Sequence, residues 1–239
     1  ANVHQPEELY RPGPDFRFLA MDARNHGETQ PLSDPDILAF DTLADDLGAL
    51  LDSLGITQAV IGGVSLGAGI ALNFTLRYPA RVRALVLSRP AWLDQPLPEN
   101  LHGLVTAASY IRKFGAAEGL AHFQASEAYA AVRQQSADSA NSLVKQFNDP
   151  RATEAVDRLE RLPNDAPNRD RAAWATISVP TLVLTTQRDL IHPHAYGVAL
   201  AEAIPGAERH ELTPQTVSRE QYQADTQARL TEFLNHHFS

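Results

Sequence analysis

Cysteine is absent from this sequence of 239 residues, which excludes disulfide frameworks and thiolate metal sites. Lysine is scarce, because only two of the twenty basic residues are lysines, and 29 acidic residues bring the net charge to −9. A nucleic-acid-binding surface would be basic, so we expect no nucleic-acid partner. No apolar run approaches the roughly 20 residues that span a bilayer, and we therefore expect a cytoplasmic protein without a membrane partner.

Methionine is nearly absent too, since the sole example is Met21 and residue 1 is Ala. We therefore expect that the chain does not begin at a translation start and that it has been processed, truncated or cut from something longer. Residues 1–15 are polar and proline-rich, and they do not resemble a signal peptide. The length and the hydrophobic content of 44% fit one globular domain with an inserted subdomain.

The most informative stretch is TQAVIGGVSLGAGIALNFTLRY, residues 57–78. It predicts a short buried strand, a turn of small residues and a helix. The turn GVSLG has the G-x-S-x-G pattern, in which a sharp strand-to-helix reversal exposes the central hydroxyl at a helix N-terminus. We expect side chains at both flanking positions to collide in this turn, so that only glycine fits there. An ordinary glycine-rich turn is the alternative, so Ser65 is a candidate nucleophile only if the chain supplies partners for it.

Strand and helix patterns alternate on both sides of this stretch, which predicts an α/β fold with a mostly parallel sheet covered by helices on both faces. Apolar runs indicate the strands, and helical spacing of apolar residues indicates the helices. The predicted strands are 16–21, 59–61, 83–88, 179–184 and 208–212, and the predicted helices outside the central stretch are 33–54, 194–204 and 219–239.

The strand rhythm stops between residues 90 and 176, where helical patterns take over. We therefore divide the chain into a core, residues 1–89 and 177–239, and a helical insertion, residues 90–176. Such an insertion is a candidate cap or lid, and a plain helical subdomain without a gating role is the alternative. The helices predicted in it are 99–113, 116–134, 137–147, 150–162 and 168–176.

Four stretches in combination resemble the α/β-hydrolase fold family: FRFLAMDARNHGET, GGVSLGAGIAL, ISVPTLVLTTQRDLIHP and the final strand and helix ending in TEFL. The resemblance covers residues 16–89 and 177–239, and it puts the helical insertion where the family carries a variable lid. It implies that Ser65 is the nucleophile, that Asp189 is the acid orienting a histidine, and that the N–H of Leu66 forms half of an oxyanion hole. A solvated loop carboxylate is the alternative for Asp189.

The histidine that the family places after its last strand is missing here. Its position falls at Ser218 or a neighbour, and no histidine occurs between His210 and His236. His210 lies within the predicted strand, too early for this role. His236 and His237 lie at the end of the last helix, where we expect a solvated tail.

Two other histidines are predicted near the carboxyl edge of the sheet. His192 follows Asp189 by three residues and is a candidate general base, with a hydrogen-bonded residue at a helix start as the alternative. His26 lies in the loop after the strand at 16–21, and packing beneath that turn is its alternative. The H-x-H spacing of His192 and His194 does not make a metal site without further ligands, so we expect no metal and no cofactor.

A family strand is missing as well. The resemblance implies a central strand and a His-Gly loop ahead of residues 16–21, where only about fifteen polar residues stand. Without that strand, buried backbone groups in the middle of the sheet would lack partners, at about 1–3 kcal/mol each. We expect the natural protein to be longer at its N-terminus or another segment to fill the slot, with residues 1–5 as the tail of the oxyanion loop. An open slot would also favour a homodimer.

The segment SRPAWLDQP follows the strand at 83–88 and is expected at the mouth of the pocket. Arg89 is a candidate for binding a substrate carboxylate, Trp92 for an apolar wall, and Asp94 for a fallback acid. A hinge of the helical insertion packed by Trp92 is the alternative.

Two functions follow from these residues. The first is a hydrolase of a small ester, lactone or related carbonyl substrate, in which Ser65 attacks and His192 takes its proton. The second is a non-catalytic or altered member of the fold that binds a small molecule in the same pocket. The intact turn and Asp189 favour the first, and the missing histidine favours the second.

Overall fold

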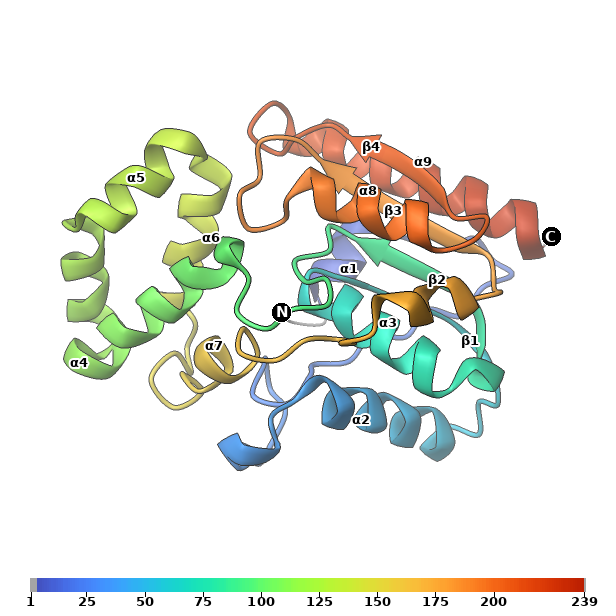
Figure 1. Cartoon of the computed structure of the whole chain (residues 1–239), viewed down its shortest axis with the longest axis horizontal. Coiled ribbons are helices and arrows are strands. Elements are labelled where there is room, and N and C mark those ends of the chain that lie inside the picture. Colours follow the sequence, from blue (N-terminus) through green and yellow to red (C-terminus); the bar gives the residue numbers. More distant parts are fainter. Residues whose placement is uncertain (1–3, 239) are drawn as a thin grey trace.

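A computed structural model describes residues 4–238. Its centre is a sheet of four parallel strands in the order β1-β2-β3-β4, and a group of helices stands to one side of it (Figure 1). The elements, in chain order, are α1 (His4–Leu9), α2 (Phe40–Ser53), β1 (Ala59–Val64), α3 (Leu66–Arg77), β2 (Val82–Ser88), α4 (His102–Gln124), α5 (Glu127–Gln135), α6 (Ala137–Phe147), α7 (Arg158–Arg161), β3 (Thr181–Thr186), α8 (His194–Ala203), β4 (Glu208–Leu212) and α9 (Arg219–Phe238), with short 3-10 turns between some of them.

The two faces of the sheet are both covered by helices, as the alternation of side chains in β2 illustrates. Leu85 and Leu87 pack with side chains of α2, α3 and α8, whereas Ala84 and Val86 pack with side chains of α9. A strand buried on both faces must be apolar at nearly every position, which is the pattern of β2. The prediction of a mostly parallel sheet with helices on both faces is confirmed.

The parallel register fixes where the loops leave the sheet. Val64 of β1 pairs with Ser88 of β2, which pairs in turn with Leu184 of β3. Because the carboxyl ends of parallel strands meet at one edge, the segments that follow these strands start side by side. Ser65 and Arg89 come directly after β1 and β2, so the register alone brings them to the same edge.

Residues 16–21, predicted as a strand, form no strand in the structure. A strand needs a neighbour that accepts and donates its backbone hydrogen bonds, and β1 is the end strand of the sheet within residues 4–238. No described segment therefore fills the slot beside β1. Phe16 and Phe18 are nonetheless partly buried, because they pack against the cluster beneath α9, whereas the adjacent Leu19 is 41% exposed.

The helix predicted to begin at Ser33 begins later. Asp34 caps a short 3-10 turn, Pro35–Ile37, by accepting the N–H of Asp36, and the chain then leaves helical geometry before α2 starts. The N–H of Phe40 at the start of α2 donates to the Asp165 carboxylate at 2.9 Å. The cap comes from a residue 125 positions away, so no local pattern could predict it.

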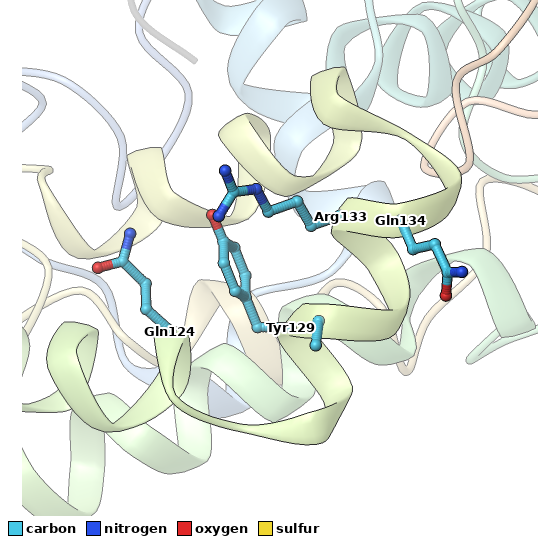
Figure 2. Close-up of a pocket in the computed structure, with 5 residues that line it drawn as sticks. Gln124, Tyr129, Arg133 and Gln134 are labelled. Carbon is cyan, nitrogen blue, oxygen red and sulfur yellow. The ribbon is translucent and has the colours of Figure 1, made fainter.

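The helical insertion differs from prediction at its breaks. Gly115, predicted as a break, is a kink with φ 75° inside α4. The predicted helix 116–134 is interrupted where Ser126 caps α5, and the predicted helix 150–162 shrinks to the four residues of α7. A hollow of about 410 Å³ lies between the end of α4 and α5 (Figure 2), and it is lined by Gln124, Tyr129, Ala130, Arg133 and Gln134.

Candidate active site

Ser65 lies in the sharp turn between β1 and α3. Its backbone has φ 57° and ψ −113°, a left-handed conformation that is rare for a residue with a side chain. A Cβ atom at Gly63 would lie 2.2 Å from the carbonyl carbon of Gly67, so glycine is required there. A Cβ at Gly67 would meet nothing within 4 Å, and the expectation that both flanking positions exclude side chains is wrong for Gly67.

Ser65, His192 and Asp189 form one hydrogen-bonded chain. The Ser65 Oγ lies 2.8 Å from Nε2 of His192, and Nδ1 of the same ring lies 2.9 Å from Oδ2 of Asp189. The two latter side chains are only 8% and 5% exposed, so these contacts lie largely out of solvent. A serine, an imidazole and a carboxylate in this order are the groups that nucleophilic acyl transfer requires.

The acid and the imidazole come from one tight turn between β3 and α8. The Asp189 Oδ1 accepts the backbone N–H groups of Ile191 and His192 at 3.1 and 3.2 Å. An aspartate that binds the N–H groups two and three residues further on stabilises such a turn. The three-residue separation noted in the sequence thus allows Asp189 to reach the ring of His192 without help from another loop.

The proton positions follow from the partners. An ionised Asp189 only accepts hydrogen bonds, so Nδ1 of His192 carries the proton and Nε2 is free to accept from the Ser65 hydroxyl. Burial, followed by the charge of Arg89, lowers the pKa of His192. Burial raises the pKa of Asp189, but the hydrogen bond from His192 and the charge of Arg89 outweigh it and hold that pKa well below its usual range. The resting pair is therefore a neutral imidazole beside a carboxylate.

Arg89 is not at the mouth of a pocket, where it was expected to bind a substrate carboxylate. Its N–H donates to the Leu184 carbonyl at 2.8 Å, which holds it between the ends of β2 and β3. There its guanidinium is buried, with Nη2 at 2.5 Å from Oδ2 of Asp189 and 2.9 Å from Nδ1 of His192. The nearest anion is thus a carboxylate of the protein itself, a correction to the predicted role.

Trp92 and Asp94 also differ from the expected pocket lining. Trp92 is 5% exposed and packs edge-to-face on Phe40 with ring centres 5.3 Å apart. It belongs to the apolar cluster that joins the core to the helical insertion, in agreement with the alternative of a packed hinge. Asp94, the expected fallback acid, pairs with Arg171 at 3.1 Å, whereas the imidazole of His192 pairs with Asp189.

The other histidines have partners elsewhere. His26 is buried, with Nδ1 at 2.8 Å from the Arg24 carbonyl, as expected for a loop residue packed beneath its own turn. His194 and His237 each face a glutamate of β4, at 3.3 and 3.2 Å. Within residues 4–238, no group of three or more potential ligand side chains is arranged to hold a metal ion.

The oxyanion donors are described only in part. Leu66 is the first residue of α3, so its N–H is among the helix-start groups that lack an intrahelical acceptor. The predicted tail of the oxyanion loop spans residues 1–5, of which residues 1–3 lie outside the described residues. No helix of the described chain is long and apolar enough to cross a membrane.

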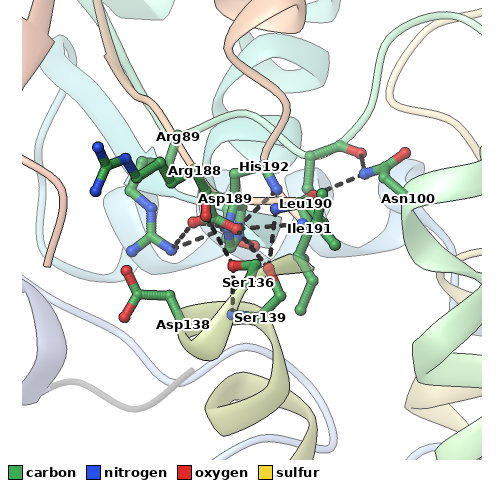
Figure 3. A network of polar contacts seen from close by, with 12 residues as sticks. Arg89, Asn100, Ser136, Asp138, Ser139, Arg188, Asp189, Leu190, Ile191 and His192 are labelled. Carbon is green, nitrogen blue, oxygen red and sulfur yellow. Dashed lines mark hydrogen bonds and ion pairs between the residues drawn. The ribbon is translucent and has the colours of Figure 1, made fainter. Parts of the chain in front are cut away.

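Sequence reasoning missed the contacts that α6 makes with the acid turn (Figure 3). The Ser136 hydroxyl donates to the Arg188 carbonyl at 2.7 Å, and the Ser139 hydroxyl accepts the Leu190 N–H at 2.9 Å. Ser139 also faces Oδ1 of Asp189 at 3.4 Å. A serine cap before α6 could have been recognised from the sequence, because Ser136 precedes a helical pattern, but its partner on another element could not.

Several known proteins are similar to this chain in sequence or in structure. The AB hydrolase superfamily protein YisY of Bacillus subtilis (strain 168) is 34% identical over 98 residues, which cover 39% of this chain and 35% of YisY. The putative carbamate hydrolase RutD of Klebsiella pneumoniae (strain 342) is 27% identical over 211 residues, or 82% of this chain and 73% of RutD. The enol-lactonase from Burkholderia xenovorans LB400 superposes with a TM-score of 0.66 at 23% identity, over 90% of this chain and 79% of that chain.

These similarities differ in the conclusion that each supports. The match to YisY spans about a third of that protein's length, and the likeness to the enol-lactonase shows the fold alone. The sequence pattern of the alpha/beta hydrolase fold family, in contrast, matches residues 2–216 and so includes the turn at Ser65, the helical insertion and the acid turn. The chain therefore belongs to the α/β-hydrolase fold family.

Proposed function

We propose that the protein is a serine hydrolase of a small ester, lactone or related carbonyl compound, with Ser65 as nucleophile, His192 as general base and Asp189 as the acid that orients it. The observation that carries the proposal is the unbroken chain of hydrogen bonds from Ser65 Oγ through the imidazole to the carboxylate, at 2.8 and 2.9 Å. Membership of the family supports a hydrolytic reaction at a carbonyl group, as do the names of a protein similar in sequence, a putative carbamate hydrolase, and of one with the same fold, an enol-lactonase.

The first half of the reaction forms an acyl-enzyme. Ser65 Oγ attacks the substrate carbonyl carbon while Nε2 of His192 takes the hydroxyl proton. The carbonyl oxygen becomes an oxyanion, which the N–H of Leu66 and the positive end of α3 stabilise. The intermediate then expels the alcohol or other leaving group, which takes the proton from the imidazolium, and the acyl group stays on Ser65.

The second half returns the enzyme to its starting state. A water molecule attacks the acyl carbon and gives a proton to Nε2 of His192. Collapse of the second intermediate releases the carboxylic acid as Ser65 Oγ recovers its proton from the imidazolium. Asp189 keeps its negative charge throughout and stabilises the imidazolium formed in each half.

A non-catalytic protein that binds a small molecule in the same pocket is the second candidate. The observation that favours it is the loop after β4, residues 213–218, which holds no histidine where the family places one. In that case Ser65 would only donate or accept a hydrogen bond to the ligand.

A fluorophosphonate probe distinguishes the two functions, because it reacts with an activated serine and needs no knowledge of the substrate. We expect the wild-type protein to be labelled on Ser65, as located by peptide mass spectrometry. Substitution His192→Gln should lower the labelling rate by roughly 10²- to 10⁴-fold, the usual contribution of a positioned general base.

The matched control is His194→Gln, because His194 lies two residues further along, at the start of α8, and faces Glu211 instead of Ser65. This variant should be labelled at the wild-type rate. Absence of labelling on Ser65 in the folded wild-type protein would refute the hydrolase and leave the binding protein.

A further inference from the structure

Arg89 is a buried cation that the reaction above does not use. It is the first residue after β2, and its backbone has φ 48°, a left-handed conformation in a residue with a long side chain. Its guanidinium carbon lies 5.9 Å from the centre of the Tyr222 ring of α9, which is 1% exposed. The side chain, itself 8% exposed, is thus enclosed between the sheet and α9 and aimed at the acid turn.

Three atoms meet at this point (Figure 3). Nη2 of Arg89 and Nδ1 of His192 both approach Oδ2 of Asp189, at 2.5 and 2.9 Å, and they lie 2.9 Å from each other. Arginine has donors only, so the nitrogen of Arg89 and the protonated Nδ1 cannot bond each other and must share the carboxylate oxygen. His192 therefore faces one negative charge, Asp189, and one positive charge, Arg89.

We propose that Arg89 is a positioning residue that acts through His192: its guanidinium opposes a second proton on the imidazole and so keeps Nε2 available as a base in mildly acidic solution. The reason is Coulombic. Taking up a proton would place two cations within 2.9 Å in a site where little solvent screens them. Asp189 offsets only part of this repulsion, because its oxygen already accepts from Arg89.

The consequence is a shifted acid limit of activity. An imidazole with an ordinary pKa of about 6.5 is mostly protonated, and hence no longer a base, at pH 5.5. With Arg89 in place, we expect the unprotonated form to persist to lower pH than in an ordinary imidazole. The lowered pKa of His192, caused first by burial and then by Arg89, has the same direction.

The test is a histidine titration followed by NMR through the Cε1–H signals, which needs neither substrate nor turnover. The signal of His192 is identified by its loss in His192→Gln. In the folded Arg89→Gln variant we expect the midpoint of this signal to rise by about one pH unit or more. Arg89→Met should give the same rise and serves as the second neutral variant, because its long apolar side chain fills part of the space of the arginine without its charge.

Two controls separate charge from shape. Arg89→Lys keeps the positive charge, and its midpoint should stay nearer to wild type than to Arg89→Gln. Arg188→Gln removes a cation that is adjacent to Asp189 in sequence but exposed to solvent, and it should leave the His192 midpoint unchanged because solvent screens that charge.

The acid limit of fluorophosphonate labelling provides a second readout and should move to higher pH in the neutral variants. A merely structural Arg89 would lower the labelling rate at every pH and leave the limit in place. An unchanged His192 midpoint in both neutral variants, or equal rises in the lysine and glutamine variants, would overturn the proposal. Because it assumes only that His192 is the base, its failure leaves labelling of Ser65, and thus the proposed function, intact.

Discussion

The loops after β3 and β4 leave the same edge of the sheet, but the first is packed against the turn at Ser65 and the second reaches the solvent. The loop after β3 carries Asp189 and His192, both buried and in line with Ser65. The loop after β4, which carries the histidine in the family resemblance, ends at the solvent, where Val217 is 59% exposed. The difference shows that a hydrogen-bonded triad depends on where three atoms lie and can be built with acid and imidazole on a single turn.

The polar contacts of the two loops explain why they differ. Asp189 organises its own loop by accepting two backbone N–H groups from it. In the loop after β4, the N–H of Thr213 donates to Asp225 of α9, and the N–H of Thr216 donates to Asp138 of α6. These contacts hold the second loop to helices on either side of it, not to the turn at Ser65.

The largest effect is expected when the histidine is removed from the loop after β3 and a histidine is placed in the loop after β4. His192→Gln should lower fluorophosphonate labelling by roughly 10²- to 10⁴-fold. Adding Val217→His restores the family's arrangement in sequence, yet we expect no recovery, because position 217 faces solvent and its neighbour Thr216 is held by Asp138. Labelling rates of the single and double variants decide this. Recovery to near wild type would show that the second loop can still deliver a base.

A smaller effect is expected from loosening the first loop. Ser139→Ala removes the acceptor of the partly buried Leu190 N–H and a contact to Asp189. The loss of a hydrogen bond of this kind costs about 1 kcal/mol, and we expect lower thermal stability and a labelling rate reduced by about tenfold or less. Ser142→Ala, on the same helix and partly exposed, is the control and should behave as wild type. Equal stability and labelling of the two variants would show that the contacts of α6 do not stabilise the acid turn.

Acid should destabilise the protein through its buried imidazoles. Burial lowers the pKa of both His26 and His192, and nearby positive charge lowers it further. Below about pH 6.5 the unfolded chain therefore takes up protons that the folded chain refuses, so stability falls with pH by up to about 1.4 kcal/mol per unit for each group.

Thermal melting between pH 8 and pH 5 measures this dependence. The midpoint should be flat with respect to these two groups above pH 7 and should fall below pH 6.5. His26→Gln and His192→Gln should each flatten the fall, since glutamine takes up no proton. A slope unchanged in both variants would contradict the assignment of buried, neutral imidazoles.

The smallest effect is expected in the second loop. Asp138→Asn keeps an acceptor for the Thr216 N–H but removes a surface charge. Exposed substitutions of this kind usually change stability by about 0.5 kcal/mol or less. Stability and Ser65 labelling should both match the wild type. A marked loss of labelling would mean that the loop after β4 contributes to the site after all.

Much of the fold follows from local patterns. The bounds of β4 and the start of α9 agree with the prediction, because turn residues flank the strand and apolar residues recur at helical spacing in α9. The prediction of a strand at residues 16–21 is wrong for a non-local reason. A strand needs a neighbouring strand to pair with, and apolar alternation does not tell whether one is present. The predicted start of α2 is wrong for a similar reason, because the cap of this helix is supplied by Asp165 of the helical insertion.

The sequence by itself determined the sharp turn at Ser65, the short spacing between Asp189 and His192, and the parallel strands that bring both to one edge. Those features depend on residues within a few positions of one another, and their steric and hydrogen-bonding preferences can be derived without coordinates. Only the tertiary structure decided that His192 meets Ser65 across 127 positions and that Arg89 turns inward to Asp189 across 100. Such pairs form between residues that folding brings together from distant parts of the sequence, and no local preference encodes that outcome.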